Sequence, residues 1–349
     1  MSSNTEKFKT IFALSKALDK KHETANSLLR LGSKNITPIP VIPTGLPTFD
    51  FGALECGGIP RGRIIEVLGP ESSGKTSFTL HVIAQEQALG GIAVFIDAEH
   101  SLDPSYAQTL GVDIDNLVIN QPSSGEEALQ VAEECIDSQC VSLIVIDSVA
   151  ALVPEAELAG EMQDASIGLQ ARLMSKALRK ITGKAATNKV TVIFISQLRE
   201  KIGVMYGSNE TTTGGRALKF YTSVRIDVRR REAIGSKENI TGHQVRLKCI
   251  KNKTGRPFRE ATVDLIYPGT ERPSGFDKIG DLIAYAIRRG LLEVSGSWYS
   301  YAGERIGQGL EKVKEVLSER PEIIEALRVK IASLEKEEGG LIEVPMEAV

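Results

Sequence analysis

The residues most able to do chemistry form one short motif. Residues 69–76 read Gly-Pro-Glu-Ser-Ser-Gly-Lys-Thr, a complete G-x-x-x-x-G-K-[ST] phosphate loop between an apolar run at 64–68 and a helical pattern at 77–88. In such a loop, glycines let successive backbone N–H groups surround phosphate oxygens, the lysine adds a positive charge, and the threonine hydroxyl can ligate Mg²⁺. The motif predicts a site for a nucleoside triphosphate, made by Gly69, Pro70, Glu71, Ser72, Ser73, Gly74, Lys75, Thr76 and Ser77.

Three further polar residues, Glu99, Asp147 and Gln197, stand at the carboxyl ends of apolar runs, where open α/β sheets bind ligands. A carboxylate at 99 can orient or deprotonate an attacking water, and Asp147 has the form of a Walker B acid that reaches Mg²⁺. Gln197 can hydrogen-bond a γ-phosphate and lose that bond after hydrolysis. A loop salt bridge at Glu99 and a solvated turn at Asp147 are the structural alternatives.

The segment from Leu198 to Thr213 follows Gln197, carries Arg199 and Lys201, and leads into the pair Gly214-Gly215. A loop that hangs on a phosphate-sensing glutamine and ends in free amides can bind a second polyanion under nucleotide control. A loop without any partner is the alternative.

Overall charge argues against a protein that binds nucleic acid with its whole surface. The 349 residues include 42 Lys and Arg against 45 Asp and Glu, so any such binding must use local patches. Between Arg225 and Arg259, eleven basic residues stand against three acidic ones, whereas residues 335–349 hold five Glu and one Lys. This asymmetry favours a polyanion partner and a short acidic tail.

The cysteines form no C-x-x-C pair and lie at no zinc-finger spacing from a histidine, so we expect free thiols at Cys56, Cys135, Cys140 and Cys249. The polar N-terminus lacks the apolar region of a signal peptide. The longest apolar stretch, 141–153, is interrupted by Asp147 and is shorter than a bilayer span. We therefore expect a cytoplasmic protein without a membrane partner.

The elements that position these residues alternate between strand and helix. Apolar runs predict strands at 63–68, 92–96, 142–146 and 190–195, and helical patterns separate them at 75–88, 125–137 and 168–186. This rhythm predicts an α/β fold, a P-loop NTPase core with a mostly parallel twisted sheet. Closely spaced runs predict antiparallel strands on one side of that sheet, at 223–229, 244–250 and 261–267.

The two ends of the chain predict smaller parts. After Phe276, short helices, the lone Trp298 and a helix at 310–336 predict a small, helix-rich α/β C-terminal domain. At the N-terminus, a helix at 6–21 places an apolar stripe on one face, formed by Phe8, Ile11, Phe12, Ser15 and Leu18. One amphipathic helix cannot bury this stripe alone, so it packs on the main body or on another copy of the chain.

Several long motifs, in this order, resemble those of the bacterial RecA recombinases. They are the phosphate loop, Phe-Ile-Asp-Ala-Glu-His at 95, Val-Ile-Asp-Ser-Val-Ala-Ala-Leu at 145, Lys-Ile-Gly-Val-Met at 201 and Thr-Thr-Thr-Gly-Gly-Arg-Ala-Leu-Lys-Phe-Tyr at 211. The likeness covers about residues 5–335. It implies a DNA-dependent ATPase that forms a helical filament on single-stranded DNA, aligns it with homologous double-stranded DNA and exchanges strands. It also implies that the polymer promotes self-cleavage of a LexA-type repressor in the SOS response to DNA damage.

The resemblance gives roles to individual residues. Lys75, Glu99 and Gln197 would act on ATP, with Thr76 and Asp147 on magnesium. Adenine contacts would come from Asp103, Tyr106 and Tyr267. The pair Lys251 and Lys253 would reach into the neighbouring subunit's ATP site, although their charge alone favours DNA contacts. Two loops, Glu157–Gly168 and Leu198–Thr212, would bind DNA mainly through Arg172, Arg199, Lys201, Ile202, Gly214 and Gly215.

The same resemblance divides the chain. A polymerisation arm would span residues 1–37, the ATPase core 38–275, the C-terminal domain 276–335 and the acidic tail 336–349. In this division the helix at 6–21 and Ser27–Arg30 pack on the next protomer and build an open filament. The first DNA loop carries three acidic residues and no basic one, so phosphate contacts there depend on Arg172, helped by apolar wedging from Met162 or Ile167.

Two other functions use the same phosphate loop. A phosphoryl transferase would turn over ATP in response to a small acceptor and would be indifferent to DNA. A hexameric helicase of related core would close into rings and unwind duplex DNA. The N-terminal helix favours head-to-tail packing without closure, and therefore an open filament.

Overall fold

The computed structural model describes residues 4–22, 28, 39–161, 168–200, 210–212 and 216–338. The chain divides into two units, residues 1–38 and residues 39–349. The smaller unit holds helix α1 (Asn4–His22), which confirms the helix predicted at 6–21. Within this unit Ser15 is buried and its Oγ accepts a hydrogen bond from the backbone N–H of Leu28 at 3.0 Å. The other residues of the predicted Ser27–Arg30 segment lie outside the described residues.

The larger unit is built on one sheet with the strand order β12-β11-β10-β9-β3-β7-β6-β4-β5. The parallel part consists of β3 (Ile64–Gly69), β7 (Thr191–Glu200), β6 (Leu143–Asp147), β4 (Ala93–Asp97), β5 (Val118–Asn120) and β9 (Val224–Gly235). Antiparallel pairing then adds β10 (Ile240–Asn252), β11 (Glu260–Ile266) and β12 (Gly275–Phe276), and β8 (Glu210–Thr212) pairs with β7. The predicted fold class is confirmed.

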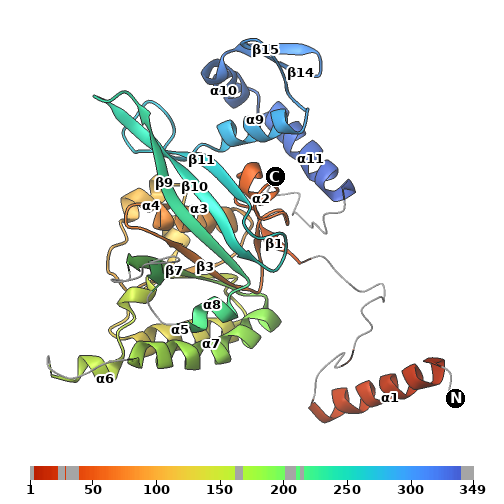
Figure 1. Cartoon of the computed structure of the whole chain (residues 1–349), viewed down its shortest axis with the longest axis vertical. Coiled ribbons are helices and arrows are strands. Elements are labelled where there is room, and N and C mark those ends of the chain that lie inside the picture. Colours follow the sequence, from red (N-terminus) through yellow and green to blue (C-terminus); the bar gives the residue numbers. More distant parts are fainter. Residues whose placement is uncertain are drawn as a thin grey trace. The chain divides into compact units, whose positions relative to one another are not determined.

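Helices cover both faces of this sheet, which explains why its central strands read as uninterrupted apolar runs. On one face, alternate residues such as Ile65 and Val67 pack with Phe78 of α3 (Lys75–Ala88). On the other face, Ile64 of β3, Ile144 of β6 and Val192 of β7 pack with three helices. These are α5 (Gly125–Ser138), α7 (Leu169–Asn188) and α8 (Ala217–Tyr221). Figure 1 shows α3 and α4 (Pro104–Thr109) above β3, and α5, α7 and α8 below it.

Short elements complete this body. They are β1 (Val41–Ile42), which pairs with β2 (Ile59–Pro60), the helix α2 (Pro47–Asp50), the helix α6 (Glu155–Leu158) and two 3₁₀ turns, η1 (Ile114–Asn116) and η2 (Val149–Ala151). All four cysteines are free, as predicted. Among the described helices, none has the length and apolar character needed to cross a membrane.

The C-terminal part has its own apolar core. It contains α9 (Lys278–Arg288), a small sheet of β13 (Glu293–Ser295), β14 (Trp298–Tyr301) and β15 (Glu304–Gln308), and the helices α10 (Leu310–Glu319) and α11 (Pro321–Glu337). The prediction of one helix at 310–336 is wrong. Pro321 has no N–H and its ring excludes the preceding helical turn, so α10 ends at Glu319 and the proline starts α11. The sheet that contains Trp298 was not predicted, because its strands are only three to five residues long.

Candidate functional site

The predicted phosphate loop directly joins β3 to α3. A Cβ atom on Gly69 would lie 2.2 Å from the carbonyl oxygen of Val228, so only glycine fits this position. Gly74 has a φ of 94°, in the left-handed region, and precedes the first turn of α3. The geometry therefore requires two glycines of the motif. Since the first N–H groups of a helix have no partner inside it, the N-terminus of α3 offers donors and a positive dipole end to phosphate.

Two polar groups of the loop, the Lys75 ammonium and the Ser73 hydroxyl, could bind a triphosphate. The ammonium of Lys75 is largely buried and donates a hydrogen bond to the carbonyl oxygen of Pro70 at 2.6 Å. Burial lowers the pKa of Lys75, and the nearby carboxylates of Asp147 and Glu99 oppose that shift. The Ser73 hydroxyl is buried and has no hydrogen-bond partner among the described residues. Buried hydroxyls are almost always bonded, so a phosphate oxygen is a fitting acceptor here.

Asp147 and Glu99 come from neighbouring strands. Asp97 and Asp147 are paired in the register of β4 and β6, and the N–H of Ala98 donates to the carbonyl oxygen of Asp147 at 2.8 Å. This bond holds the turn that carries Glu99 against the end of β6. The Thr76 hydroxyl donates to Oδ2 of Asp147 at 2.7 Å. Burial raises the pKa of Asp147 to about 6, against the effect of the Thr76 hydrogen bond.

Glu99 is held from two sides. Gln197 Nε2 donates a hydrogen bond to Oε1 of Glu99 at 2.8 Å, and the Ser148 hydroxyl donates to the same oxygen. Gln197 lies opposite Gly69 in the register of β3 and β7, so its amide is adjacent to the phosphate loop. Ser148 was not among the residues predicted from the sequence. It could have been predicted from its position, because it directly follows Asp147 at the carboxyl end of β6.

Two of the predicted adenine contacts lie at α4. The Asp103 carboxylate caps this helix by accepting a hydrogen bond from the N–H of Ser105 at 2.8 Å. The hydroxyls of Tyr106 and Ser77 are hydrogen-bonded at 2.7 Å, which ties α4 to the first turn of α3. Burial raises the pKa of Tyr106. The Tyr106 side chain therefore lies beside the end of the phosphate loop.

The third predicted adenine contact, Tyr267, follows β11 and lies near enough to Tyr106 to raise its pKa further. His243 of β10 holds it, with 3.0 Å between Nδ1 and the tyrosine hydroxyl and 5.5 Å between the ring centroids. His243 was not selected either. It could have been predicted only from the antiparallel register of β10 and β11, which pairs His243 with Leu265, two residues before Tyr267. The structure therefore brings the predicted adenine residues together.

Lys251 and Lys253 lie at the other end of the sheet. Asn252, between them, is paired with Val224 of β9, and Val224 is paired with Ile65 near the start of β3. The phosphate loop follows the opposite end of β3. With a rise of about 3.3 Å per residue, the two lysines lie on the order of 15 Å from the phosphate loop of their own protomer. The structure does not bring them together with the other predicted ATP residues.

The Lys251 ammonium is held in place by a helix end. Its Nζ donates hydrogen bonds to the carbonyl oxygens of Lys219 and Phe220, at 2.6 and 3.2 Å, in the last turn of α8. These carbonyls have no partner within the helix, so a lysine satisfies them and also meets the negative end of the helix dipole. Burial lowers the pKa of Lys251, and Lys253 and Arg225 lower it further.

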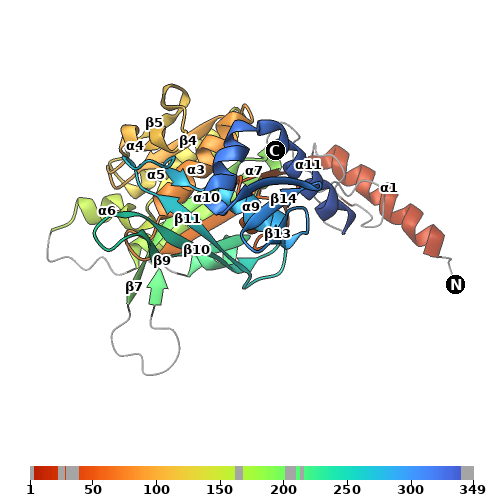
Figure 2. The same cartoon turned by 90° about the horizontal axis from the view of Figure 1, so that it is seen from above.

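The predicted DNA loops emerge from the same edge of the sheet as the ATP residues. The first loop begins with α6, and residues 162–167, including Met162 and Ile167, lie outside the described residues. Arg172 is exposed in the first turn of α7. In the second loop, β7 runs to Glu200 and pairs with β8, beyond the strand end predicted at 195 (Figure 2). The backbone places Arg199 in this ribbon. The other predicted contacts lie outside the described residues: Lys201, Ile202, Gly214 and Gly215.

Two family models together match most of the chain. Residues 9–270 match the model of the RecA N-terminal domain, and residues 280–334 match that of the RecA C-terminal domain. A protein named Protein RecA from Acidothermus cellulolyticus is 51% identical over 92% of this chain and 91% of its own. The corresponding protein of Saccharopolyspora erythraea is 50% identical over 95% of this chain and 94% of its own. That of Mycobacterium sp. strain KMS is 53% identical over 87% and 86%.

Two family models and three relatives, each matched over most of its length, leave one conclusion. The chain belongs to the RecA family, the DNA-binding, self-assembling, DNA-dependent ATPases of homologous recombination and DNA repair.

Proposed function

We propose that this protein polymerises on single-stranded DNA into an open helical filament, pairs that strand with homologous double-stranded DNA and exchanges strands. The filament would also promote self-cleavage of a LexA-type repressor in the SOS response. The observation that carries this proposal is the position of Lys251 and Lys253 at the end of the sheet opposite their own phosphate loop. A lysine there can act on ATP only if the ATP belongs to another protomer.

An ATP shared between protomers implies a head-to-tail interface, because one protomer offers its phosphate loop and the next offers its lysines. A heterologous interface of this kind builds an open helix when its rotation does not close. Helix α1 supports such an assembly. Its residues Phe8, Ile11 and Phe12 are 41%, 45% and 41% exposed, and a neighbouring copy can cover this stripe. Residues 1–37 would then be the polymerisation arm.

In the proposed ATP site each group has a distinct role. Lys75 and the loop amides hold the phosphates, Glu99 orients the attacking water, and Gln197 senses the γ-phosphate. Lys251 and Lys253 of the next protomer stabilise the charge of the transition state, as an arginine finger does. The base would lie against Tyr106 and Tyr267. Asp103, at the cap of α4, would complete its surroundings.

Thr76 and Asp147 fit a magnesium ion. Their side-chain oxygens are already 2.7 Å apart, and hydroxyl, carboxylate, phosphate and water oxygens are the ligands that Mg²⁺ prefers. Among the described residues no cluster of three or more His, Cys, Asp and Glu could hold a metal ion. We assign the remaining ligands to ATP and water. The ion, when bound, would neutralise charge that develops between the outer phosphates.

Single-stranded DNA would lie along the loops at the carboxyl edge of the sheet. We assign its contacts to Arg172, Arg199, Lys201, Ile202, Gly214 and Gly215. Phosphate contacts from basic side chains and amides carry little sequence information, so binding would be largely independent of sequence. The core would span residues 38–275 and the C-terminal domain 276–335. Residues 336–349 would form a short acidic tail, and the protein would act in the cytoplasm.

The deciding experiment measures ATP hydrolysis and particle size with and without a single-stranded oligonucleotide. We expect oligonucleotide to raise the rate at least about tenfold and to produce filaments by electron microscopy. Lys75→Ala should hydrolyse no ATP. Turnover that depends on a small acceptor but not on DNA would instead indicate a phosphoryl transferase. Closed rings would indicate a helicase.

The proposed effect on a LexA-type repressor needs a separate assay. Purified LexA-type repressor is incubated with the filament, ATP and single-stranded DNA, and cleavage is followed by gel electrophoresis. Cleavage is expected only when all three are present. Absence of cleavage beside normal strand exchange would remove the SOS role and leave the recombinase.

A further inference from the structure

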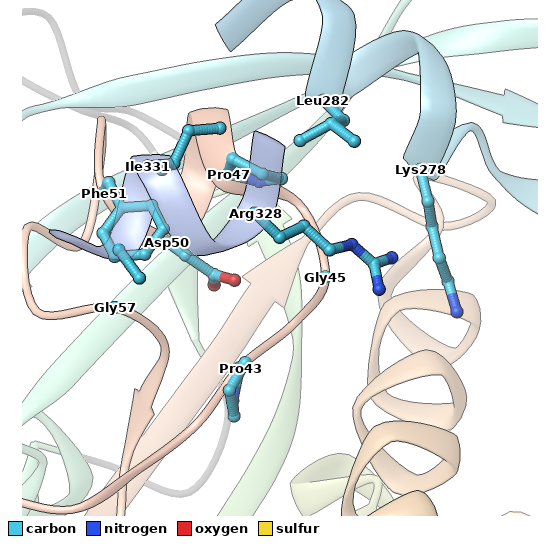
Figure 3. A pocket seen from close by; sticks show the side chains of 11 residues that line it. Pro43, Gly45, Pro47, Asp50, Phe51, Gly57, Lys278, Leu282, Arg328 and Ile331 are labelled. Carbon is cyan, nitrogen blue, oxygen red and sulfur yellow. The ribbon is translucent and has the colours of Figure 1, made fainter. Parts of the chain in front are cut away.

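A pocket outside the ATP site lies where residues 43–57 meet α9 and α11 (Figure 3). Most of its wall is apolar, formed by Pro43, Pro47, Phe51, Leu282, Ile331 and Ala332. Two cations line it as well, Lys278 at the start of α9 and Arg328 on α11. Figure 3 shows the Arg328 side chain extending from α11 toward Lys278.

These cations are half-buried and have no ion-pair partner among the described residues. Neither Lys278 Nζ nor the Arg328 guanidinium forms an ion pair or a hydrogen bond with any described residue. Burial lowers the pKa of both groups, and Arg328 lowers the pKa of Lys278 further, so the two charges repel each other. Glu325, one turn earlier on α11, opposes the shift at Arg328 but lies beyond ion-pair distance. Two adjacent cations without an ion-pair partner among the described residues are an unfavourable arrangement in a partly buried site.

One carboxyl group, that of Asp50, also lines the pocket, and Asp281 and His81 lie nearby; each of the three is hydrogen-bonded to Thr44 or Thr48 and not to Lys278 or Arg328. Asp50 accepts hydrogen bonds from the Thr44 N–H and hydroxyl, at 2.9 and 2.8 Å, and burial raises its pKa well above the usual range. Asp281 of α9 is bonded to Thr48, and burial raises its pKa to about 7. His81 of α3 is buried with a pKa lowered to about 3, so it is neutral at physiological pH.

We propose that Lys278 and Arg328 bind a small oxyanion of the phosphate class in this pocket. A guanidinium offers several N–H donors in one plane and an ammonium adds a point charge, and together they match an anion with several oxygens. The Lys278 stem passes beside Gly45, whose added Cβ would lie 3.7 Å from the lysine Cδ. The anion would therefore connect α9 and α11 of the C-terminal domain to residues 43–57 of the core. Binding of this anion would require neither ATP nor DNA.

The test uses orthophosphate on the full-length protein. The phosphate loop also binds phosphate, so every sample carries Lys75→Ala, which removes that site's charge. Equilibrium dialysis with radioactive orthophosphate, at constant ionic strength in chloride, is expected to give about one phosphate per chain. Adding Lys278→Met or Arg328→Met should weaken binding about tenfold, the loss typical of one charge-assisted hydrogen bond. The matched control is Lys330→Met on the same helix, whose ammonium lies over Tyr301 and away from the pocket.

The melting temperature gives a second measurement of phosphate binding, and it also shows whether each variant is folded. Phosphate at about ten times its dissociation constant should raise the melting temperature of the Lys75→Ala protein by about 2 to 4 °C relative to chloride, and that of the Lys278→Met version by only about a third as much. Absence of binding in Lys75→Ala, or binding that survives both pocket substitutions, overturns the proposal.

Discussion

Gln197 donates a hydrogen bond to Glu99, with 2.8 Å between Nε2 and Oε1. Gln197 belongs to β7, which continues as a ribbon with β8 into the proposed second DNA loop. Glu99 is the carboxylate expected to orient the attacking water. One hydrogen bond therefore joins the proposed chemistry to the strand that leads to the proposed DNA loop. A γ-phosphate that competes for the Gln197 amide would break this bond and report the nucleotide state to β7.

Replacing Gln197 by Ala should uncouple DNA binding from ATP. In the variant the affinity for single-stranded DNA with ATP should fall toward the value without nucleotide, a loss of roughly 5- to 150-fold for typical coupling energies. Fluorescence anisotropy of a labelled oligonucleotide measures it. Gln130→Ala is the matched control, because it removes a similar amide–carboxylate bond, to Glu134 on the surface of α5. Unchanged affinity in Gln197→Ala would sever the proposed link.

Ser148 should act as a positioning residue for Glu99. Without its hydroxyl, the carboxylate keeps only the Gln197 bond and samples other orientations. Ser148→Ala should therefore lower kcat about tenfold and leave KM for ATP nearly unchanged, because only the transition state needs the oriented carboxylate. Ser148→Thr keeps the hydroxyl and should recover part of the loss. A rise in KM with unchanged kcat would assign Ser148 to ATP binding instead.

Asp281 should make the stability of the protein depend on pH. Burial raises its folded-state pKa to about 7 from an unfolded value of 3.8, so the folded state holds more protons between these values and the free energy of unfolding falls as pH rises. Asp281→Asn, which stays neutral, should be more stable than the wild type by about 2 kcal/mol at pH 5, where the unfolded aspartate is already ionised. At pH 8 it should be more stable by about 4 kcal/mol.

Urea denaturation at pH 5 and pH 8 measures this difference. The asparagine can still accept from the Thr48 N–H and donate to its hydroxyl, so the contact between α2 and α9 is kept. Glu325→Gln, an exposed charge removed from α11, is the control and should change little at either pH. Equal destabilisation by Asp281→Asn at both pH values would mean that the aspartate is charged and favourable in the fold.

The sequence predicted the sheet well because its central strands are buried on both faces. The run Leu143–Ile146 is apolar at every position, and such runs between helical patterns are typical of parallel strands. The β5 strand was missed for the opposite reason. It is three residues long and largely exposed, so it carries no pattern. The break between α10 and α11 could have been predicted from Pro321. It was missed because the Glu and Lys residues on both sides follow one continuous helical pattern.

Site residues could be predicted from the sequence where they directly follow a strand. They could not be predicted where their position depends on how distant strands pair. Glu99, Asp147 and Gln197 each follow an apolar run, and the structure brings them together. His243 acts only through Tyr267, 24 residues later, and no local pattern reveals this contact. Charge alone assigned Lys251 to DNA. Only the register of β3, β9 and β10 places it at the far end of the sheet.

The position of Lys251 leads to a complementation test of the shared ATP site. Glu99→Ala and Lys251→Ala should each hydrolyse ATP slowly. In a mixed filament, a Lys251→Ala protomer keeps its own Glu99, and a Glu99→Ala neighbour can supply the missing lysine. Random mixing in equal amounts makes about one site in four complete, so the mixture should reach about a quarter of the wild-type rate. Two inactive variants of a site built within one protomer would gain nothing on mixing. A flat response across all mixing ratios, with filaments formed, would therefore place Lys251 outside the ATP chemistry.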